Sequence, residues 1–214
     1  MCASILEESN AAVTRVVPLT VEQYHRMIEA AILPEGEPIE LIDGFLVRKD
    51  RSAIGADPMT VGHAHRLVVT RILNLAARLH SFTCHVYSQN PITLPPRQEP
   101  EPDGAIVRGV PQDYRDHHPG PADVSCVIEV AETSLSYDRT TKQRVYAEAG
   151  IPQYPLVNIP ERQIEVYEQP SPREGRYLKR VIVRSAQQIR VALGLERYLD
   201  VSADDLLPYG RAQL

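Results

Sequence analysis

The sequence predicts an α/β or α+β domain in which helices flank a mixed β-sheet. Two amphipathic helical patterns, at residues 20–31 and 63–80, alternate with short apolar runs that are typical of strands. One of these runs, 124–131, is apolar at both parities, which is typical of a strand buried on both faces. The composition, 43% hydrophobic and 24% charged over 214 residues, fits one domain with a sizeable core.

The N-terminal part predicts an arm, a helix and a hairpin. Residues 1–17 carry two acidic residues and no long apolar segment, so we expect a flexible arm ahead of a single domain at 18–214. Thr20 is placed to cap the first helix, and Pro34 and Gly36 end it. The segment IELIDGFLV predicts a β-hairpin with a tight turn at Asp43-Gly44.

The remaining elements alternate between strands and helices. Apolar spacing predicts a long helix at 63–80, strands at 84–94 and 102–109, and a polar loop at 108–123. After the buried strand, Asp138 is the expected N-cap of a helix that runs to about Ala149, with Gly150 just past its end. Four further strands are expected at 153–159, 163–169, 177–183 and 188–193.

Charge and cysteine content exclude some classes of protein. A net charge of -5 gives no support to a protein that coats nucleic acid through a basic surface, although a local basic groove remains open. Widely spaced cysteines without a CxxC pair favour reduced thiols in the cytoplasm over disulfides or a zinc site. No window approaches the ~18 apolar residues of a transmembrane helix. Five arginines could line a groove or be solvated: Arg66, Arg71, Arg78, Arg139 and Arg144.

Three carboxylates stand inside apolar strand patterns, namely Glu40, Asp103 and Glu129. A charged group such as Glu129 in a doubly buried strand costs several kcal/mol unless it is paired, hydrogen-bonded or bound to metal. If the strands meet in one sheet, the acids repel one another, and a hard cation such as Mg²⁺ or Mn²⁺ would remove that repulsion. Each acid alone could instead pair with an arginine or a backbone amide.

Two cations follow Asp138 near the expected start of its helix. Arg139 and Lys142 would oppose the helix dipole there, at about 0.3–1 kcal/mol each. A negative centre facing this helix end, from the acidic strand or from a substrate phosphate, would compensate them. Tyr146 follows Lys142 by four residues and shares its helix face. The alternative is a solvated lysine on an exposed helix.

These residues occur in an order that resembles a known family. The residues that carry the resemblance are Pro102-Asp103, Ile128-Glu129-Val130, Ser134, Tyr137-Asp138, Lys142, Tyr146 and 149–152. With this ordered set, the chain from about Leu19 to about Leu207 resembles the Uma-two type of endonuclease, formerly a domain of unknown function, within the PD-(D/E)XK restriction-endonuclease-like superfamily.

The resemblance implies a restriction-endonuclease-like sheet with a metal site at the end of its central strands. Asp103 and Glu129 correspond to the two acids and would hold Mg²⁺ or Mn²⁺, with the Val130 backbone carbonyl as a further ligand. The superfamily lysine usually follows the second acid after one residue, where Ala131 stands here. The family resembled here places it on the next helix, at Lys142.

Four other residues enter the site through the same resemblance. Glu40 matches an acid of the first hairpin and would complete the catalytic set. His65 matches a histidine near the start of the long helix and, with Tyr146 and Asp138, would contact substrate or support the metal ligands. A lone histidine at a helix start can also be a cap or a surface residue.

Three features depart from the family pattern. Gln153-Tyr154-Pro155 stands where relatives often have Glu-Tyr-Trp, Asn158 stands where an aspartate often ends the strand, and the chain has no tryptophan. Because Pro155 cannot donate to a sheet ladder, we expect this strand to be an edge strand or to bulge at the proline.

The sequence therefore predicts a metal-dependent endonuclease that hydrolyses phosphodiester bonds of nucleic acid, with DNA as the expected substrate and no membrane association. A homodimer is expected, because cutting two strands commonly uses two sites and because the late strands offer an edge. One alternative is a catalytically inactive nuclease-fold protein that binds nucleic acid or protein. A hydrolase that uses two carboxylates without metal is another, but it leaves Lys142 without a role.

Overall fold

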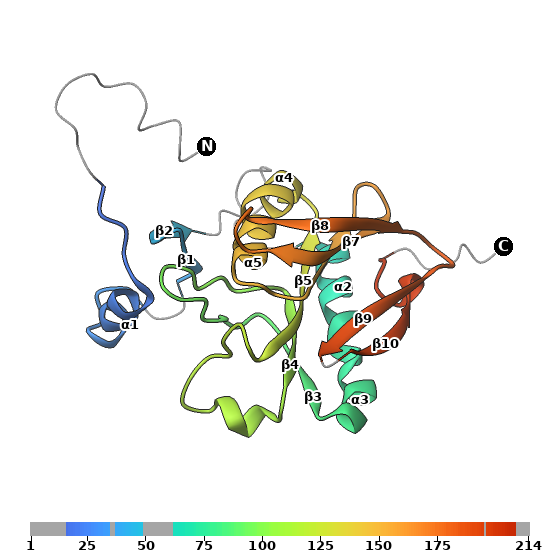
Figure 1. Cartoon of the computed structure of the whole chain (residues 1–214), viewed down its shortest axis with the longest axis horizontal. Coiled ribbons are helices and arrows are strands. Elements are labelled where there is room, and N and C mark those ends of the chain that lie inside the picture. Colours follow the sequence, from blue (N-terminus) through green and yellow to red (C-terminus); the bar gives the residue numbers. More distant parts are fainter. Residues whose placement is uncertain (1–15, 35–36, 49–61, 195, 209–214) are drawn as a thin grey trace, which may run out of the picture.

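The computed structural model describes residues 16–34, 37–48, 62–194 and 196–208. Apart from Val16 and Val17, the predicted flexible arm lies outside the described residues. Figure 1 shows the elements, which follow in the order α1 (Val21–Glu29), β1 (Ile39–Ile42), β2 (Phe45–Arg48), α2 (His63–Asn74), α3 (Ala76–Leu79), β3 (Cys84–Tyr87), β4 (Gly104–Arg108), β5 (Val124–Ala131), α4 (Leu135–Tyr137), a π-helical turn (Asp138–Lys142), α5 (Gln143–Glu148), β6 (Gln153–Asn158), β7 (Gln163–Ser171), β8 (Arg176–Val183), β9 (Gln188–Gly194) and β10 (Arg197–Ser202).

A six-stranded mixed sheet in the order β3-β4-β5-β6-β7-β8 forms the centre of the molecule. β5 pairs antiparallel with β4 and parallel with β6, whereas the other neighbours in this sheet are antiparallel. All of β5 is buried, as its apolar run predicts. The predicted α+β class, with helices flanking a mixed sheet, is confirmed.

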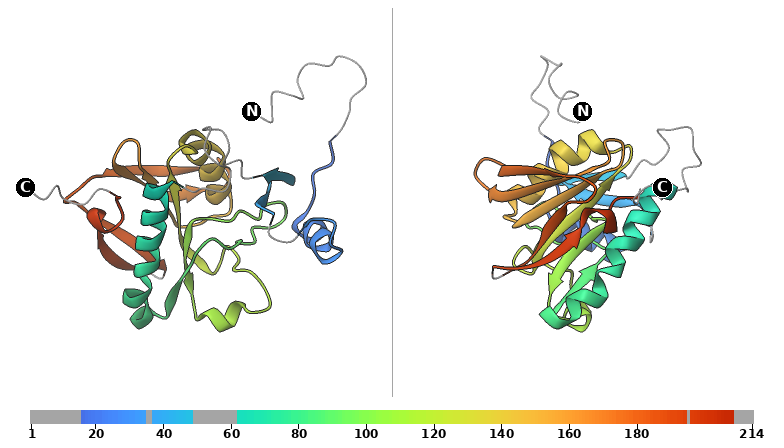
Figure 2. Two further views of the ribbon diagram at one scale, coloured as in Figure 1. Left: turned by 180° about the vertical axis from the view of Figure 1, so that it is seen from behind. Right: turned by 90° about the vertical axis from the view of Figure 1, so that its right-hand side faces the viewer.

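Alternate side chains of β5 enter two cores on opposite faces of the sheet. Figure 2 shows α2 and α3 on one side of this sheet and the α4–α5 segment on the other. The first core joins α2, α3, β9 and β10 to one parity of β5, which comprises Cys126, Ile128 and Val130. Val127 and Ala131 belong to the second core, with Val145 and Tyr146 of α5. Glu129 has the second parity, and its side chain therefore faces α5.

Helix α2 lies close against the start of β4. A Cβ atom added at Gly104 would lie 2.7 Å from Ile72 Cγ2, which is closer than real side chains approach. The absence of a side chain at Gly104 therefore lets the helix pack directly on the strand beside Asp103.

The N-terminal helix and hairpin form as the sequence predicts. Thr20 caps α1 in a capping box with Gln23, in which the Gln23 N–H donates to Thr20 Oγ1 at 3.2 Å and the Thr20 N–H donates to Gln23 Oε1 at 2.9 Å. Asp43 and Gly44 connect β1 to β2 with φ values of 55° and 78°, the positive values that a primed hairpin turn requires.

The hairpin is attached to the chain just before β4. Leu41 and Glu99 form a β-bridge in which the Glu99 N–H donates to the Leu41 carbonyl at 2.7 Å. The Glu101 N–H, two residues on, donates to Glu40 Oε1 at 2.7 Å. These contacts place Glu40 next to the segment that leads into Asp103.

The helix expected to begin at Asp138 begins earlier, so Asp138 is not an N-cap. Ser134 is the N-cap of α4, and the backbone continues through the π turn into α5. Ser134 and Asp138 are one turn apart and both suit an N-cap, so the sequence pattern could not distinguish them. Arg139 and Lys142 consequently lie beyond the first turn, where the helix dipole has little effect. Gly150 has the expected position after the helix, with a φ of 72°.

The expectation of an edge strand or bulge at Pro155 is wrong. β6 lies between β5 and β7, and its register with β7 shows no shift at Pro155. The parallel ladder with β5 begins at Leu156, so the proline precedes this ladder rather than interrupting it.

One of the late strands, β8, does form an edge of the six-stranded sheet. Strand β10 is not predicted from the sequence, and the expected strand at 84–94 is shorter in the structure, at Cys84–Tyr87.

Among the described residues, Cys84 and Cys126 are buried free thiols, and Cys2 lies outside this part of the chain. None of the helices in the described ranges is long and apolar enough to cross a membrane.

Candidate active site

Hydrogen bonds and ion pairs connect six of the predicted site residues near the carboxyl end of β5. They come from β1, the residue before β4, β5, the π turn, α5 and α2, so segments far apart in sequence converge here. The connected residues are Glu40, Asp103, Glu129, Lys142, Tyr146 and His65.

Groups of the protein itself compensate the buried carboxylate of Glu129. The Tyr146 hydroxyl donates to Glu129 Oε1 at 2.6 Å, and Lys142 Nζ lies 3.3 Å from the same oxygen. The Asp103 N–H donates to Oε2 at 3.2 Å. Burial raises the pKa of Glu129, the Lys142 charge lowers it, and the charges of Asp103 and Glu40 raise it further. Pairing with protein groups therefore accounts for this acid in its apolar strand without a metal ion.

Lys142 lies between two buried carboxylates. Its Nζ is 2.7 Å from Glu40 Oε1, and the Lys142 and Glu40 side chains are only 5% and 2% exposed. Burial lowers the pKa of Lys142, but the charges of Glu129 and Glu40 outweigh it and hold the pKa above its ordinary value. Nζ also lies 6.0 Å from the centre of the Tyr146 ring, so these side chains are neighbours, as their spacing predicts. Lys142 is therefore a protonated donor at neutral pH.

Asp103 forms the solvent-facing side of the cluster. Its Oδ2 accepts the Val130 N–H at 2.9 Å and lies 3.1 Å from His65 Nε2. The side chains of Asp103 and His65 are each 17% exposed. Burial lowers the pKa of His65, but the hydrogen bond and the charge of Asp103 outweigh burial, and the pKa is raised. Within the described part of the chain, the hydrogen bonds of the Asp103 carboxylate are made by Oδ2 and none is made by Oδ1.

Asp138 lies beside the cluster, and its contact is with Ser134. The Ser134 hydroxyl donates to Asp138 Oδ2 at 2.5 Å, and the side chain is buried. Burial and then the charge of Glu129 raise the pKa of Asp138 to about 7, although Ser134 and Lys142 lower it. Asp138 can therefore gain or lose a proton near neutral pH.

Two residues near the cluster were not assigned from the sequence. The Tyr137 hydroxyl is buried and makes no hydrogen bond to any described residue, and burial raises its pKa to about 12 even though the Lys142 charge lowers it. Tyr137 precedes Lys142 by five residues, a spacing that suits one π turn, which the sequence did not reveal. Glu132 follows β5, and its charge contributes to the raised pKa of His65.

The five arginines considered for a basic groove all contact groups of the protein itself. Arg71 and Arg78 donate to backbone carbonyls in the segment 200–207. Arg66 contacts a histidine, whereas Arg139 and Arg144 pair with carboxylates. These contacts within the protein argue against a phosphate groove lined by the five arginines.

The donor set at the cluster fits a cation that takes few protein ligands. Among the described residues, no three His, Cys, Asp or Glu side chains form a group that could hold a metal ion by themselves. Asp103 and Glu129 nevertheless supply two carboxylates beside the Val130 backbone. Mg²⁺ characteristically takes one or two carboxylates and completes its shell with water and phosphate. Zinc favours histidine and cysteine ligands, so the set fits Mg²⁺ or Mn²⁺ better.

A family profile and a solved structure both match this chain. A family profile described as "Uma2: Putative restriction endonuclease" matches residues 21–202. Among solved structures, the chain is similar to one described as a putative nuclease belonging to DUF820 from Anabaena variabilis ATCC 29413. That similarity has a TM-score of 0.61 at 17% identity and covers 88% of this chain and 97% of that one. At this identity it establishes a shared fold, in agreement with the predicted restriction-endonuclease-like class. No curated protein matches.

Proposed function

The chain belongs to the Uma2 family, described as putative restriction endonucleases, and from this premise we propose that it is a metal-dependent endonuclease that hydrolyses phosphodiester bonds of DNA. One observation carries the proposal: Asp103, Glu129 and Lys142 meet in one connected cluster near the end of β5. The description of the similar solved structure as a putative nuclease supports the same class.

In this proposal, Asp103 and Glu129 hold Mg²⁺ or Mn²⁺, with the Val130 carbonyl as a further ligand. The cation would supply activation of water and stabilisation of negative charge on the phosphate. The partial exposure of the Asp103 side chain, 17%, supports access from solvent at this point.

Lys142 acts in the proposal as a charged hydrogen-bond donor to the phosphate or to the attacking water. A fixed ammonium group stabilises the negative charge that develops on the phosphate in the transition state. Its raised pKa argues against a role as the base that removes a proton from water. Glu40 keeps the lysine charged and in place through the 2.7 Å contact.

The other candidate residues act through these groups. His65 orients Asp103 by their 3.1 Å contact, and Tyr146 orients Glu129 by its 2.6 Å hydrogen bond. Asp138 supports the cluster from beside it through its 2.5 Å hydrogen bond with Ser134.

The metal site is tested by titrating the protein with Mn²⁺ in a calorimeter. The parent should bind, and Asp103→Ala should lose binding because one of two carboxylate ligands is gone. Glu174→Gln, which removes an exposed acid between β7 and β8, is the matched control and should bind as the parent does. Equal Mn²⁺ affinity for Asp103→Ala and the parent would refute the assignment.

A second candidate function is a nuclease-fold protein that binds nucleic acid without cutting it. The observation in its favour is that Lys142, Tyr146 and a backbone amide already satisfy Glu129. Retention of a DNA fragment in a gel-shift assay, with no cleavage in Mg²⁺ or Mn²⁺, would favour this candidate.

We also propose a cytoplasmic homodimer. The buried free thiols support a reducing compartment, and the β8 edge supports pairing with a second copy. Sedimentation at micromolar concentration tests the dimer: a monomer under those conditions would exclude it.

A further inference from the structure

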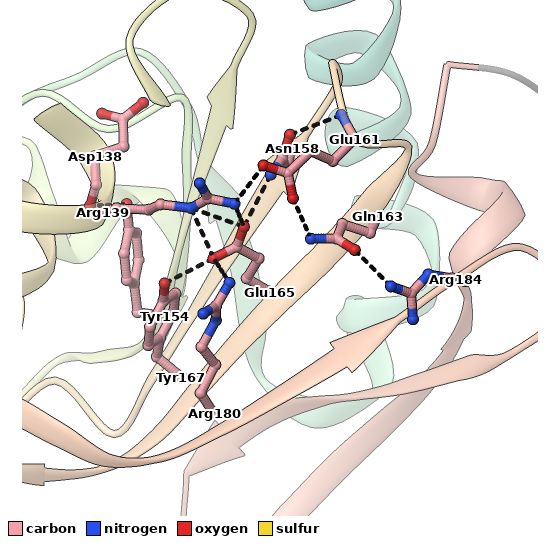
Figure 3. Close-up of polar contacts among 10 residues, drawn as sticks. All are labelled: Asp138, Arg139, Tyr154, Asn158, Glu161, Gln163, Glu165, Tyr167, Arg180 and Arg184. Atoms are coloured by element: carbon pink, nitrogen blue, oxygen red, sulfur yellow. Dashed lines mark hydrogen bonds and ion pairs between the residues drawn. The ribbon is translucent and has the colours of Figure 1, made fainter. Parts of the chain in front are cut away.

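A buried glutamate on β7, Glu165, binds the helical turn that carries Lys142. The Glu165 side chain is fully buried, and Figure 3 shows the polar groups around it. Arg139 Nε donates to Oε1 at 3.0 Å and to Oε2 at 3.2 Å, and Arg180 Nη2 donates to Oε2 at 2.7 Å. The Asn158 amide and the Tyr167 hydroxyl donate at 2.9 Å and 2.7 Å.

Asn158 fits this arrangement better than an aspartate would. Its Nδ2 donates to Glu165, while its Oδ1 accepts the Glu161 N–H at 3.0 Å. An aspartate at this position would place a second carboxylate against Glu165 without a donor between them. The asparagine at the end of β6, which departs from the family pattern, thus matches the buried acid on β7.

The Glu165 carboxylate remains charged in the folded protein. Burial raises the pKa of Glu165, but the hydrogen bonds from Arg139, Asn158 and Tyr167 outweigh it and bring the pKa to about 2. A buried ion pair of this kind is weak evidence for stability, because the desolvation cost offsets the attraction. A role in fixing one arrangement of the chain explains it better.

Arg139 lies within the π turn, three residues before Lys142. The preceding residue is also bound to the sheet, because the Tyr154 hydroxyl of β6 donates to the Asp138 carbonyl at 3.1 Å. π turns are rare, and they occur mostly as single turns at functional sites. The turn is therefore held by β6 and β7 at its start, and Lys142 at its end contacts Glu40 and Glu129.

We propose that Arg139 and Glu165 are positioning residues, whose ion pair fixes the π turn so that Lys142 Nζ is held between Glu40 and Glu129. The effect on catalysis rests on the proposed nuclease function, whereas the placement of Lys142 does not. Arg180 supplies an internal comparison, because it binds the same carboxylate from β8 and not from the helix.

The experiment measures how readily the Lys142 amine reacts with an acylating reagent, with the products quantified by mass spectrometry. The chain has only three lysines, Lys49, Lys142 and Lys179. Lys179 is 51% exposed and serves as the reference within each sample. The variants are Arg139→Gln, Arg139→Lys and the control Arg180→Gln. The buried thiols of Cys84 and Cys126 report unfolding if they become reactive.

Arg139→Gln should raise the ratio of Lys142 to Lys179 labelling about tenfold, because it releases a charged contact that holds the turn. Arg139→Lys should give an intermediate ratio, since lysine keeps the charge but not the forked contact. Arg180→Gln should change the ratio less than about twofold.

An unchanged ratio in Arg139→Gln, or an equal rise in Arg180→Gln, would overturn the proposal. If the thiols show that Arg139→Gln has unfolded, Arg139→Lys decides: an unchanged ratio there overturns the proposal, and a rise supports it. If the parent cleaves DNA, Arg139→Gln should lower kcat with little change in KM. A parent without cleavage would count against the proposed function alone, because the labelling ratios still test the placement of Lys142.

Discussion

Replacing Lys142 by methionine removes the ammonium group between Glu40 and Glu129 and keeps nearly the same volume. The two carboxylates are 2% and 8% exposed, so neither can be hydrated in place of the lost cation. Removing one partner of a buried ion pair costs about 3–5 kcal/mol of unfolding free energy. With a urea dependence of about 2 kcal/mol per molar, the unfolding midpoint should fall by about 2 M.

The loss of unfolding free energy in Lys142→Met should also depend on pH. Burial raises the pKa of Glu129 and Lys142 lowers it, so the pKa rises further in the variant. A carboxyl with a folded pKa above its unfolded value binds more protons when folded, and its contribution to stability grows as the pH falls. The deficit of Lys142→Met should therefore be largest at pH 8 and smaller at pH 5.

Urea unfolding followed by circular dichroism measures this loss, since the chain has no tryptophan to report it by fluorescence. The control is Lys179→Met, which removes a lysine that is 51% exposed and pairs with Glu168, and it should cost at most about 1 kcal/mol. A deficit below about 1 kcal/mol for Lys142→Met, or one that does not shrink between pH 8 and pH 5, would refute the reasoning.

Three further predictions concern the surroundings of the site. Tyr146→Phe removes the 2.6 Å hydrogen bond to Glu129 and should cost about 1.5–3 kcal/mol in urea unfolding; a neutral effect would contradict that bond. Gly104→Ala would place a Cβ 2.7 Å from Ile72 Cγ2 and should destabilise by about 1–3 kcal/mol; unchanged thermal unfolding would show that the helix is not packed so closely. The pKa of Glu165 is about 2 in the folded protein and about 4.3 in the unfolded chain, so the ionised carboxylate stabilises the fold above about pH 4.3. This stabilisation is lost as the pH falls toward 2, and the difference in unfolding free energy between the parent and Glu165→Gln should shrink across that range. An equal difference at pH 7 and pH 2.5 would contradict this prediction.

The sequence predicts those parts of the fold that depend only on residues close together in the chain. Thr20 and Gln23 form a capping box within four residues, and Asp43-Gly44 needs only its own backbone to form a tight turn. The apolar run around Glu129 identified the central strand because both parities were apolar. The resemblance to a nuclease family implies a site of Asp103, Glu129 and Lys142, and the structure brings these three residues together.

Contacts between distant residues could not be read from the chain in the same way. Arg139 and Glu165 are 26 residues apart, and no local pattern pairs them. The sequence predicts a helix start at Asp138 and not at Ser134 because both residues suit an N-cap, and the π turn at Asp138–Lys142 is therefore not predicted. The sequence likewise does not identify the partners of Glu129, because its hydrogen bond with Tyr146 depends on how α5 packs against β5.

The most direct test of the account is cleavage of supercoiled plasmid by the purified protein in Mg²⁺ or Mn²⁺, with EDTA and Asp103→Asn as controls. This variant keeps an oxygen that can accept the Val130 N–H and removes the charge that would bind the metal. We expect metal-dependent nicking that EDTA abolishes and that Asp103→Asn slows at least about 100-fold. Cleavage that persists in EDTA, or a variant as active as the parent, would contradict it.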